Sequence, residues 1–276
     1  MILLSDISNK PILILKNSSI SDVIKKLLEN NLSRLIVVED VKPVGIISEK
    51  DIGLFLFSET TNQGLENIPL VKIMKPILFI EESLSLQDSA KTIIENEVSS
   101  LVVGSSIELK GIFTKTDLVK HYEDNKLDQN KVVDYMTHDY VSTHTATPLF
   151  KVVRKMLKRK VSRVIIKDQN ENPVGVISFR DLFRISIELG NEEDNSRSFI
   201  LDKIRKGFLS EEGFGNISLA RDVMTKGLIT IKFNQNLSDA CKLILENNVS
   251  GLVVLDGNEL IAGTISKTDI TRAIAK

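Results

Sequence analysis

Residues 33–51 have the sequence SRLIVVEDVKPVGIISEKD, and this pattern occurs four times in the chain. Each copy begins at a serine, carries a glycine in its second half and ends in Ser/Thr-x-x-Asp. From serine to aspartate the spacing is 18, 18, 19 and 19 residues. Because this spacing is nearly constant, we infer that the chain arose by internal duplication. The fold is then expected to consist of four copies of one structural unit. The serines are Ser33, Ser99, Ser162 and Ser250, and the glycines are Gly45, Gly111, Gly175 and Gly263.

An amphipathic helix is predicted just upstream of each copy. In the first copy, Ile20, Val23, Ile24, Leu27 and Leu28 follow the i, i+3, i+4, i+7, i+8 spacing of a helix with one buried face. The β-branched runs at 35–38, 101–103, 164–166 and 252–255 predict buried strands. Each copy is therefore expected to consist of an extended lead-in segment, a helix, two strands and a second helix, which the Ser/Thr begins.

The copies also pair by type. The first and third share Ser-Arg and Pro-Val-Gly, whereas the second and fourth share Lys-Thr-Asp. This ABAB pattern predicts a duplicated two-copy module with its boundary in the polar segment 121–130. We expect a first module over 1–122 (copies at about 4–58 and 68–122) and a second over 130–276 (copies at about 130–186 and 218–276).

An insertion over residues 187–217 separates the third and fourth copies. It carries a short helical pattern at Ile200, Leu201, Ile204 and Phe208. We expect an elaborated connection that covers the core, with a lid or an oligomer contact as the alternative.

The composition is that of an ordinary globular protein of about two domains. The 276 residues include 36 Lys and Arg and 37 Asp and Glu, for a net charge of −1. This charge disfavours nucleic acid as a partner, and the basic run RKMLKRK at 154–160 is interpreted as the solvated side of a helix. One cysteine excludes a disulfide framework and a Cys/His zinc site. Without a predicted signal peptide or membrane span, we expect a cytoplasmic protein.

The repeats resemble the CBS domain, named after cystathionine β-synthase. The family's hydrophobic-Met-Thr opening is present at 135–137 and 223–225 and in part at 73–74, whereas the first copy has Ile7-Ser8-Asn9. The resemblance implies an α/β (α+β) fold of four β-α-β-β-α units, packed as two pseudo-twofold Bateman modules with one cleft per copy. Chains with two such modules include stand-alone microbial proteins and the gamma subunit of AMP-activated protein kinase.

The Ser/Thr-x-x-Asp motif has two interpretations. It forms a capping box that satisfies free N–H groups at a helix start. A carboxylate at a strand-to-helix turn can also accept both hydroxyls of a ribose, and the adjacent helix N-terminus favours phosphate. The acid is Asp in every copy and never Glu, which reaches back better in a capping box, so we expect ribose contact for at least one copy. The candidates are Ser48 and Asp51, Thr114 and Asp117, Ser178 and Asp181, and Ser266 and Asp269.

Two arginines follow the first serine of a copy, where the resemblance implies a phosphate ligand. They are Arg34 and Arg163, and arginine suits bidentate phosphate contacts. The resemblance further implies that the contact crosses the pseudo-twofold. Arg34 would then serve the cleft of Asp117, and Arg163 the cleft of Asp269.

Further candidates complete the predicted sites. Lys115 and Lys267 lie at helix starts and would add positive charge, and Arg180 lies near Asp181. Thr145 matches a family threonine that contacts the ribose. The third copy thus has the best ribose set and the second and fourth the best phosphate set, so the sequence does not rank the clefts.

Motifs of catalysis are absent from the sequence. It contains no nucleophile elbow, P-loop or Rossmann glycine fingerprint, and its three histidines lack metal-ligand spacing. We expect a non-enzymatic sensor with no required cofactor and no metal, which binds AMP, ADP or ATP and signals to a partner protein as a monomer or homodimer. The alternatives are an interaction module with degenerate clefts, or binding of another adenosyl ligand such as S-adenosylmethionine or NAD.

Overall fold

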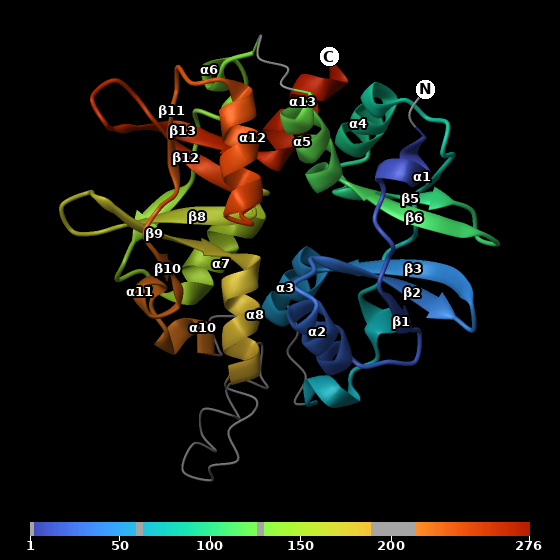
Figure 1. The fold of residues 1–276 in the computed structure, drawn as a ribbon. Helices are drawn as coiled ribbons and strands as arrows, with labels where there is room; N and C mark the ends of the chain where they lie inside the picture. The colour runs from blue at the N-terminus through green and yellow to red at the C-terminus, as the bar shows by residue number, and fades with distance from the viewer. Residues whose placement is uncertain (1–2, 59–62, 126–129, 189–213) are drawn as a thin grey trace. The chain divides into compact units, whose positions relative to one another are not determined.

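The structure is a computed structural model of residues 1–276, and it describes residues 3–58, 63–125, 130–188 and 214–276. Four copies of one plan follow each other along the chain (Figure 1). The predicted α+β class and the four repeats are therefore confirmed. The helical pattern at 200–208 lies outside the described residues, so the role of the insertion stays a prediction.

Each copy consists of a lead-in strand, a helix, two more strands and a final helix. In the first copy these are β1 (Leu13–Leu15), α2 (Ile20–Glu29), β2 (Arg34–Glu39), β3 (Lys42–Ser48) and α3 (Glu49–Ser58). In the second they are β4 (Phe79–Ile80), α4 (Leu86–Glu95), β5 (Ser100–Gly104), β6 (Leu109–Thr114) and α5 (Lys115–Asp124).

The third and fourth copies repeat this order. The third has β7 (Ser142–His144), α7 (Leu149–Lys158), β8 (Arg163–Lys167), β9 (Pro173–Ser178) and α8 (Phe179–Glu188). The fourth has β11 (Thr230–Lys232), α12 (Leu237–Glu246), β12 (Gly251–Leu255), β13 (Ile261–Ser266) and α13 (Lys267–Ala275). Short elements before the copies are α1 (Leu4–Ile7), η1 (Leu65–Asn67), η2 (Leu70–Lys72), α6 (Val132–Tyr135), α10 (Phe214–Ile217), α11 (Ala220–Val223) and β10 (Thr225–Lys226).

The three strands of each copy pair in the same way, and in the third copy β10 adds a fourth strand beside β9. The lead-in strand pairs in parallel with the next strand, which pairs antiparallel with the third. The parallel pairing needs a crossover, and the first helix of each copy provides it. Each antiparallel pair shifts register next to the repeat glycine, as between Val37 and Val38 opposite Gly45. Such a bulge increases the local twist.

The first helices form as the apolar spacing predicts. In α2, Ile20, Val23, Ile24 and Leu27 are buried, and a capping box at Ser19 begins the helix. In α12, Cys241 is fully buried on the same stripe, as expected. Burial raises the pKa of its thiol to about 12, so the side chain acts as a small apolar group.

The described chain divides into two compact units. Unit 1 consists of 1–11, 77–140 and 228–276, and unit 2 of 12–76 and 141–227. Unit 1 thus holds the bodies of the second and fourth copies, where α5 packs on α12 and α13 (Figure 1). Unit 2 holds those of the first and third copies, where α3 packs on α7 and α8. The module boundary at 121–130 stays a prediction.

Within unit 2, α3 and α8 approach closely at a glycine. A β-carbon added to Gly53 would overlap the ring of Phe179, which is buried. Alanine at an exposed helical position would stabilise by about 1 kcal/mol over glycine. Here we expect Gly53→Ala to destabilise by about 1–3 kcal/mol, because the overlap forces repacking. Urea unfolding measures the change.

The matched control is the same substitution in a Phe179→Leu background. With the ring removed, we expect Gly53→Ala to be neutral or stabilising. An equal loss in both backgrounds would show that the α3–α8 contact does not limit the size of residue 53.

Candidate functional site

Each Ser/Thr-x-x-Asp motif lies where the last strand of a copy continues into the final helix. One oxygen of the aspartate, Oδ2, accepts the backbone N–H of the Ser or Thr at 3.0, 2.7, 2.7 and 2.8 Å along the four copies. The same oxygen accepts the Ser or Thr hydroxyl. The capping interpretation is therefore confirmed in every copy. Aspartate reaches back without difficulty, so the assumption that glutamate caps better does not hold here.

The other carboxylate oxygen, Oδ1, meets a donor from a lead-in segment in three copies. Each donor is an amide or hydroxyl side chain, and it lies in the segment that precedes the neighbouring copy in the sequence. The contacts are Asn9 Nδ2 to Asp117 at 2.6 Å, Thr225 Oγ1 to Asp181 at 2.7 Å and Thr137 Oγ1 to Asp269 at 3.2 Å.

The first copy differs from the other three. No hydrogen bond from a described residue reaches the second oxygen of Asp51. Lys75 holds the equivalent lead-in position and pairs with Ile46 through its backbone, at 2.8 and 2.9 Å. The four turns therefore share the cap, whereas the Oδ1 contact depends on the lead-in residue.

The donors reach their partners because consecutive copies exchange their lead-in segments. The segment before one copy pairs with the last strand of its neighbour, between the first and second copies and between the third and fourth. The pairs are Asn9 with Ile112, Lys75 with Ile46, Thr137 with Thr264, and Thr225 with Val176.

The repeat glycine lies directly against the exchanged segment. A β-carbon on Gly263 would lie 2.5 Å from the carbonyl oxygen of Thr137, and one on Gly175 would lie 2.6 Å from that of Thr225. A larger side chain would push the segment away. The glycine is therefore required for close approach of two backbones, which in turn places the Oδ1 donor.

Asn9, Thr137 and Thr225 are site residues that the sequence did not predict. Thr137 and Thr225 belong to the Met-Thr opening, which marks the repeat in the sequence but does not by itself indicate a contact with the aspartate. Asn9 lay in the stretch that departs from that opening. The exchange between copies is a tertiary feature, so spacing within one copy does not reveal it.

In unit 1, the two predicted lysines form a reciprocal pair of contacts. Lys115 Nζ donates to Thr268 Oγ1 at 3.0 Å, and Lys267 Nζ donates to Thr116 Oγ1 at 2.9 Å. The first residue of α5 thus contacts the second residue of α13, and the first residue of α13 contacts the second residue of α5. Both ammonium groups are held beside two helix N-termini, which attract anions.

In unit 2, the equivalent positions hold an ion pair. Arg180 Nε lies 3.0 Å from Glu49 Oε1, and Arg180 Nη1 donates to Asn31 Oδ1 at 3.0 Å. Glu49 is largely buried, with its side chain 16% exposed. Burial raises the pKa of this carboxyl, and the nearby Arg180 offsets only part of that increase.

Arg34 and Arg163 begin β2 and β8, each opposite the turn serine of its own copy. Arg34 is in register with Ser48, and Arg163 with Ser178. Both arginines lie in unit 2, whereas Asp117 and Asp269 lie in unit 1. The clefts that the family resemblance assigns to these pairs stay predictions.

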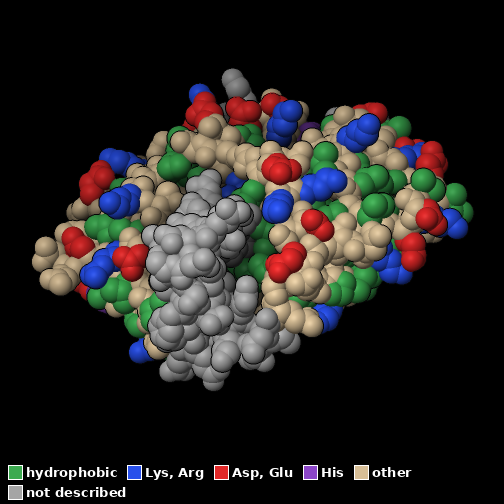
Figure 2. Space-filling model, turned by 90° about the horizontal axis from the view of Figure 1, so that it is seen from below, with side chains coloured by type: hydrophobic (Ala, Val, Ile, Leu, Met, Phe, Trp, Pro, Cys, Tyr) green, Lys and Arg blue, Asp and Glu red, His purple; other side chains and the backbone are tan. Residues whose placement is uncertain are grey.

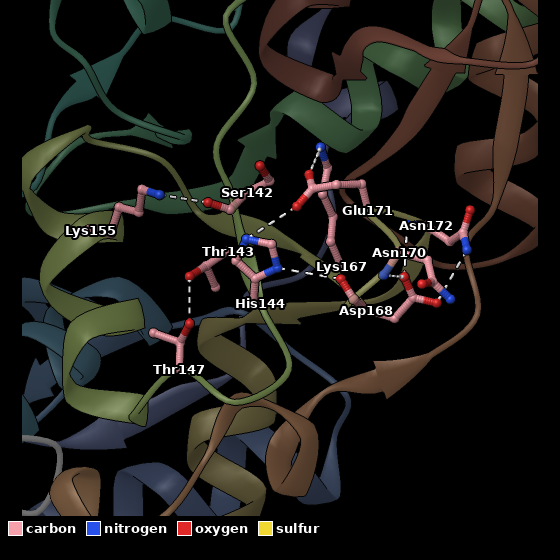
Figure 3. A network of polar contacts seen from close by, with 10 residues as sticks. All are labelled: Ser142, Thr143, His144, Thr147, Lys155, Lys167, Asp168, Asn170, Glu171 and Asn172. Carbon is pink, nitrogen blue, oxygen red and sulfur yellow. Dashed lines mark hydrogen bonds and ion pairs between the residues drawn. The ribbon is translucent and has the colours of Figure 1, made fainter.

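Thr145 directly follows the lead-in strand β7, whose residues Ser142, Thr143 and His144 are drawn in Figure 3. Its N–H donates to the Lys167 carbonyl at 2.9 Å. Among the described residues, no hydrogen bond joins Thr145 to Ser178 or Asp181. The neighbouring His144 lies 3.3 Å from Glu171 Oε1. In the described ranges, no three His, Cys, Asp or Glu side chains gather as metal ligands would.

Four repeats of this plan, each with a capping aspartate and an exchanged lead-in segment, make up the described chain. The CBS domain family matches residues 4–56, 70–124, 132–188 and 220–276. The chain therefore belongs to the CBS-domain family.

Similar proteins are known from archaea. Protein MJ1225 of Methanocaldococcus jannaschii is 23% identical over 284 residues, covering 97% of this chain and 96% of that protein. Its crystal structure, presented as that of a proposed archaeal homologue of γ-AMPK, has a TM-score of 0.83 at 20% identity and covers 99% of this chain and 100% of that chain. An uncharacterised conserved protein from Pyrococcus horikoshii has a TM-score of 0.64 at 18% identity, with 99% of each chain covered. These likenesses show the shared fold.

A match to an enzyme is partial. The L-aspartate semialdehyde sulfurtransferase of M. jannaschii is 29% identical over 121 residues, which is 43% of this chain and 23% of that enzyme. The match therefore spans under a quarter of the enzyme. Among the helices of the described residues, none combines the length and the apolar character that crossing a membrane requires.

Gly263→Ala is expected to push Thr137 away from Asp269, because the new methyl group would meet the Thr137 carbonyl. We expect a loss of about 1–3 kcal/mol in the free energy of unfolding. Gly257→Ala in the same copy is the matched control. Nothing lies within 4 Å of a β-carbon there, so we expect a change within about 0.5 kcal/mol. Equal losses would contradict the role of Gly263.

Glu49→Gln is expected to change how stability depends on pH. The folded pKa of Glu49 is raised above its usual 4.5, so the folded state binds this proton more tightly. Its stabilising contribution is complete below pH 4.5 and is lost as the pH rises through the folded pKa. Urea unfolding over a pH series should show wild type losing stability relative to Glu49→Gln as the pH rises. The opposite slope would mean that the Arg180 ion pair outweighs burial.

Proposed function

We propose that the protein is a non-enzymatic regulatory sensor that binds AMP, ADP or ATP at its Ser/Thr-x-x-Asp turns and signals to a partner protein. The observation that supports this most is the turn of the second, third and fourth copies. Each combines a carboxylate oxygen, a side-chain donor and a helix N-terminus. Carboxylate oxygens accept ribose hydroxyls, and helix N-termini favour phosphate.

The proposed ribose sites follow the observed turns. Each takes the turn hydroxyl, the aspartate and the lead-in donor, and Thr145 is proposed to add a contact in the third copy. Arg34, Arg163, Lys115, Lys267 and Arg180 are the proposed phosphate ligands. The proposed ribose-contacting residues are Thr114, Asp117 and Asn9 for the second copy, Ser178, Asp181 and Thr225 for the third, and Ser266, Asp269 and Thr137 for the fourth. The first copy has Ser48 and Asp51 and no lead-in donor.

The turn geometry suggests how binding would be transmitted. A ribose hydroxyl that donates to Oδ1 would share this oxygen with the lead-in donor, as Thr137 and Arg272 already share Oδ1 of Asp269. Sharing the oxygen weakens each bond to it, and so weakens the hold of one copy on the exchanged segment of its neighbour. A ligand shifts such an equilibrium only by its different affinity for the two arrangements. A partner protein would respond to the position of these segments.

The same contacts favour a second candidate, an interaction module without a ligand. In three copies both carboxylate oxygens are engaged inside the protein, and Asp269 Oδ1 accepts a further bond from Arg272 at 2.6 Å. In this alternative the aspartates act only as caps and clamps. Binding of S-adenosylmethionine or NAD is the other alternative, because both present an adenosine ribose.

Calorimetric titration with AMP, ADP, ATP, S-adenosylmethionine, NAD and GTP tests these candidates. Asp269→Asn keeps an oxygen for the cap but removes the negative charge and the second carboxylate oxygen that would accept a ribose hydroxyl. Thr137→Val removes only the lead-in hydroxyl. We expect Asp269→Asn to lower the number of bound adenine nucleotides by one. A ligand at about 100 times its Kd should also stabilise wild type by about 2.7 kcal/mol, or at least about 2 °C in Tm.

Asp239→Asn is the matched control, since Asp239 caps α12 by accepting the Asn236 N–H at 3.1 Å and lies outside the proposed sites. It should leave the stoichiometry unchanged. If no ligand binds, the interaction module is favoured. If stoichiometry is the same in wild type and Asp269→Asn, the fourth-copy turn is not a ribose site.

A further inference from the structure

In unit 2, a glutamate lies at a repeat position that a lysine occupies in unit 1. Glu49 begins α3 and contacts Arg180, the second residue of α8. Lys115 begins α5 and contacts Thr268, the second residue of α13. The two contacts are therefore equivalent in the repeat, and the charge at the first helical position is inverted between the units.

The guanidinium of Arg180 is engaged inside unit 2 on two of its three nitrogens. Nε donates to Glu49 Oε1 at 3.0 Å, and Nη1 donates to Asn31 Oδ1 at 3.0 Å. The backbone of Glu49 is also fixed, because its N–H donates to the Ser33 carbonyl at 3.0 Å. Protein groups therefore hold Arg180, which the proposed function assigns to a ligand phosphate.

This ion pair is less exposed than a pair on the open surface. On the face in Figure 2, basic and acidic side chains are interspersed at the surface. In the first copy, the side chains of the pair Lys16 and Glu39 are 39% and 57% exposed. Those of Arg180 and Glu49 are 28% and 16% exposed. Charges interact more strongly where water is partly excluded, so the Glu49 carboxylate acts on any charge placed beside Arg180.

A second negative charge beside Glu49 is unfavourable. Burial raises the pKa of this carboxyl, Arg180 and Arg34 offset part of the increase, and Asp181 adds to it. The surroundings thus disfavour even the charge that is already there. A ligand phosphate that reached Arg180 would lie next to this carboxylate, and like charges a few ångströms apart repel each other.

We propose that Glu49 determines the ligand specificity of the turns in unit 2, which bind adenosyl ligands whose 5′ group carries no negative charge in preference to nucleotides. Its carboxylate holds Arg180 in place of a ligand phosphate. This inference rests on the proposed function, because it assigns a ligand class to turns that are proposed there as ribose sites. The turns of unit 1, with Lys115 at the equivalent position, are left for the nucleotides.

Calorimetric titration of the full chain with adenosine and with AMP tests this assignment. All variants carry Asp117→Asn and Asp269→Asn, which leave intact the aspartates of the unit 2 turns, Asp51 and Asp181. In this background we expect adenosine to bind more tightly than AMP. Glu49→Gln keeps the shape of the side chain and removes its charge. It should raise the affinity for AMP about 10-fold and change that for adenosine less than about 2-fold.

Glu39→Gln is the matched control, since it removes one carboxylate from an exposed ion pair in the same copy. It should leave the ratio of AMP affinity to adenosine affinity unchanged, and melting curves establish which variants are folded. Both glutamate substitutions are also made in the otherwise unchanged chain, which does not depend on the folding of the background. There, the number of AMP molecules bound per chain should rise with Glu49→Gln and not with Glu39→Gln.

The outcomes separate this inference from the proposed function. If both ligands bind and Glu49→Gln shifts their affinities equally or not at all, the ion pair is structural, and the inference is overturned while the proposed function stands. The same holds if AMP binds the background more tightly than adenosine does. If neither ligand binds the otherwise unchanged chain, the proposed function fails and the inference fails with it.

Discussion

In three of the four copies, the fold depends on one carboxylate that serves two elements at once. Through Oδ2 the turn aspartate caps the final helix, and through Oδ1 it holds the lead-in segment of a neighbouring copy in three of the four turns. A cap alone would stabilise one helix. Since the second contact joins residues more than 40 positions apart, it fixes how consecutive copies are connected.

The repeat glycine follows from the same constraint. The exchanged segment pairs with the last strand, and its carbonyl comes within 2.5–2.6 Å of where a β-carbon would stand at Gly263 or Gly175. The lead-in residue that pairs beside this glycine differs between the copies, and it is Asn9, Lys75, Thr137 or Thr225. The scaffold is thus constant, whereas the group offered to the second carboxylate oxygen is specific to each copy.

The two units also differ at equivalent positions. In unit 1 two lysines contact threonines reciprocally, and in unit 2 Arg180 meets the buried Glu49. A partly buried ion pair must offset a desolvation cost, which is why the pKa of Glu49 is raised despite its partner. Such differences give one repeat plan a distinct local charge in each unit.

The sequence by itself determined the four copies, their strand and helix order, the buried helix stripes and the capping aspartates, because these depend on periodicity and local hydrogen bonds. The spacing that predicts the cap at Asp269 does not predict Thr137, since their contact spans 132 positions. Only the tertiary structure decided the lead-in exchange, the need for Gly263 and the pairing of Arg180 with Glu49. Each of these depends on which backbones meet after folding, and local patterns do not encode that geometry.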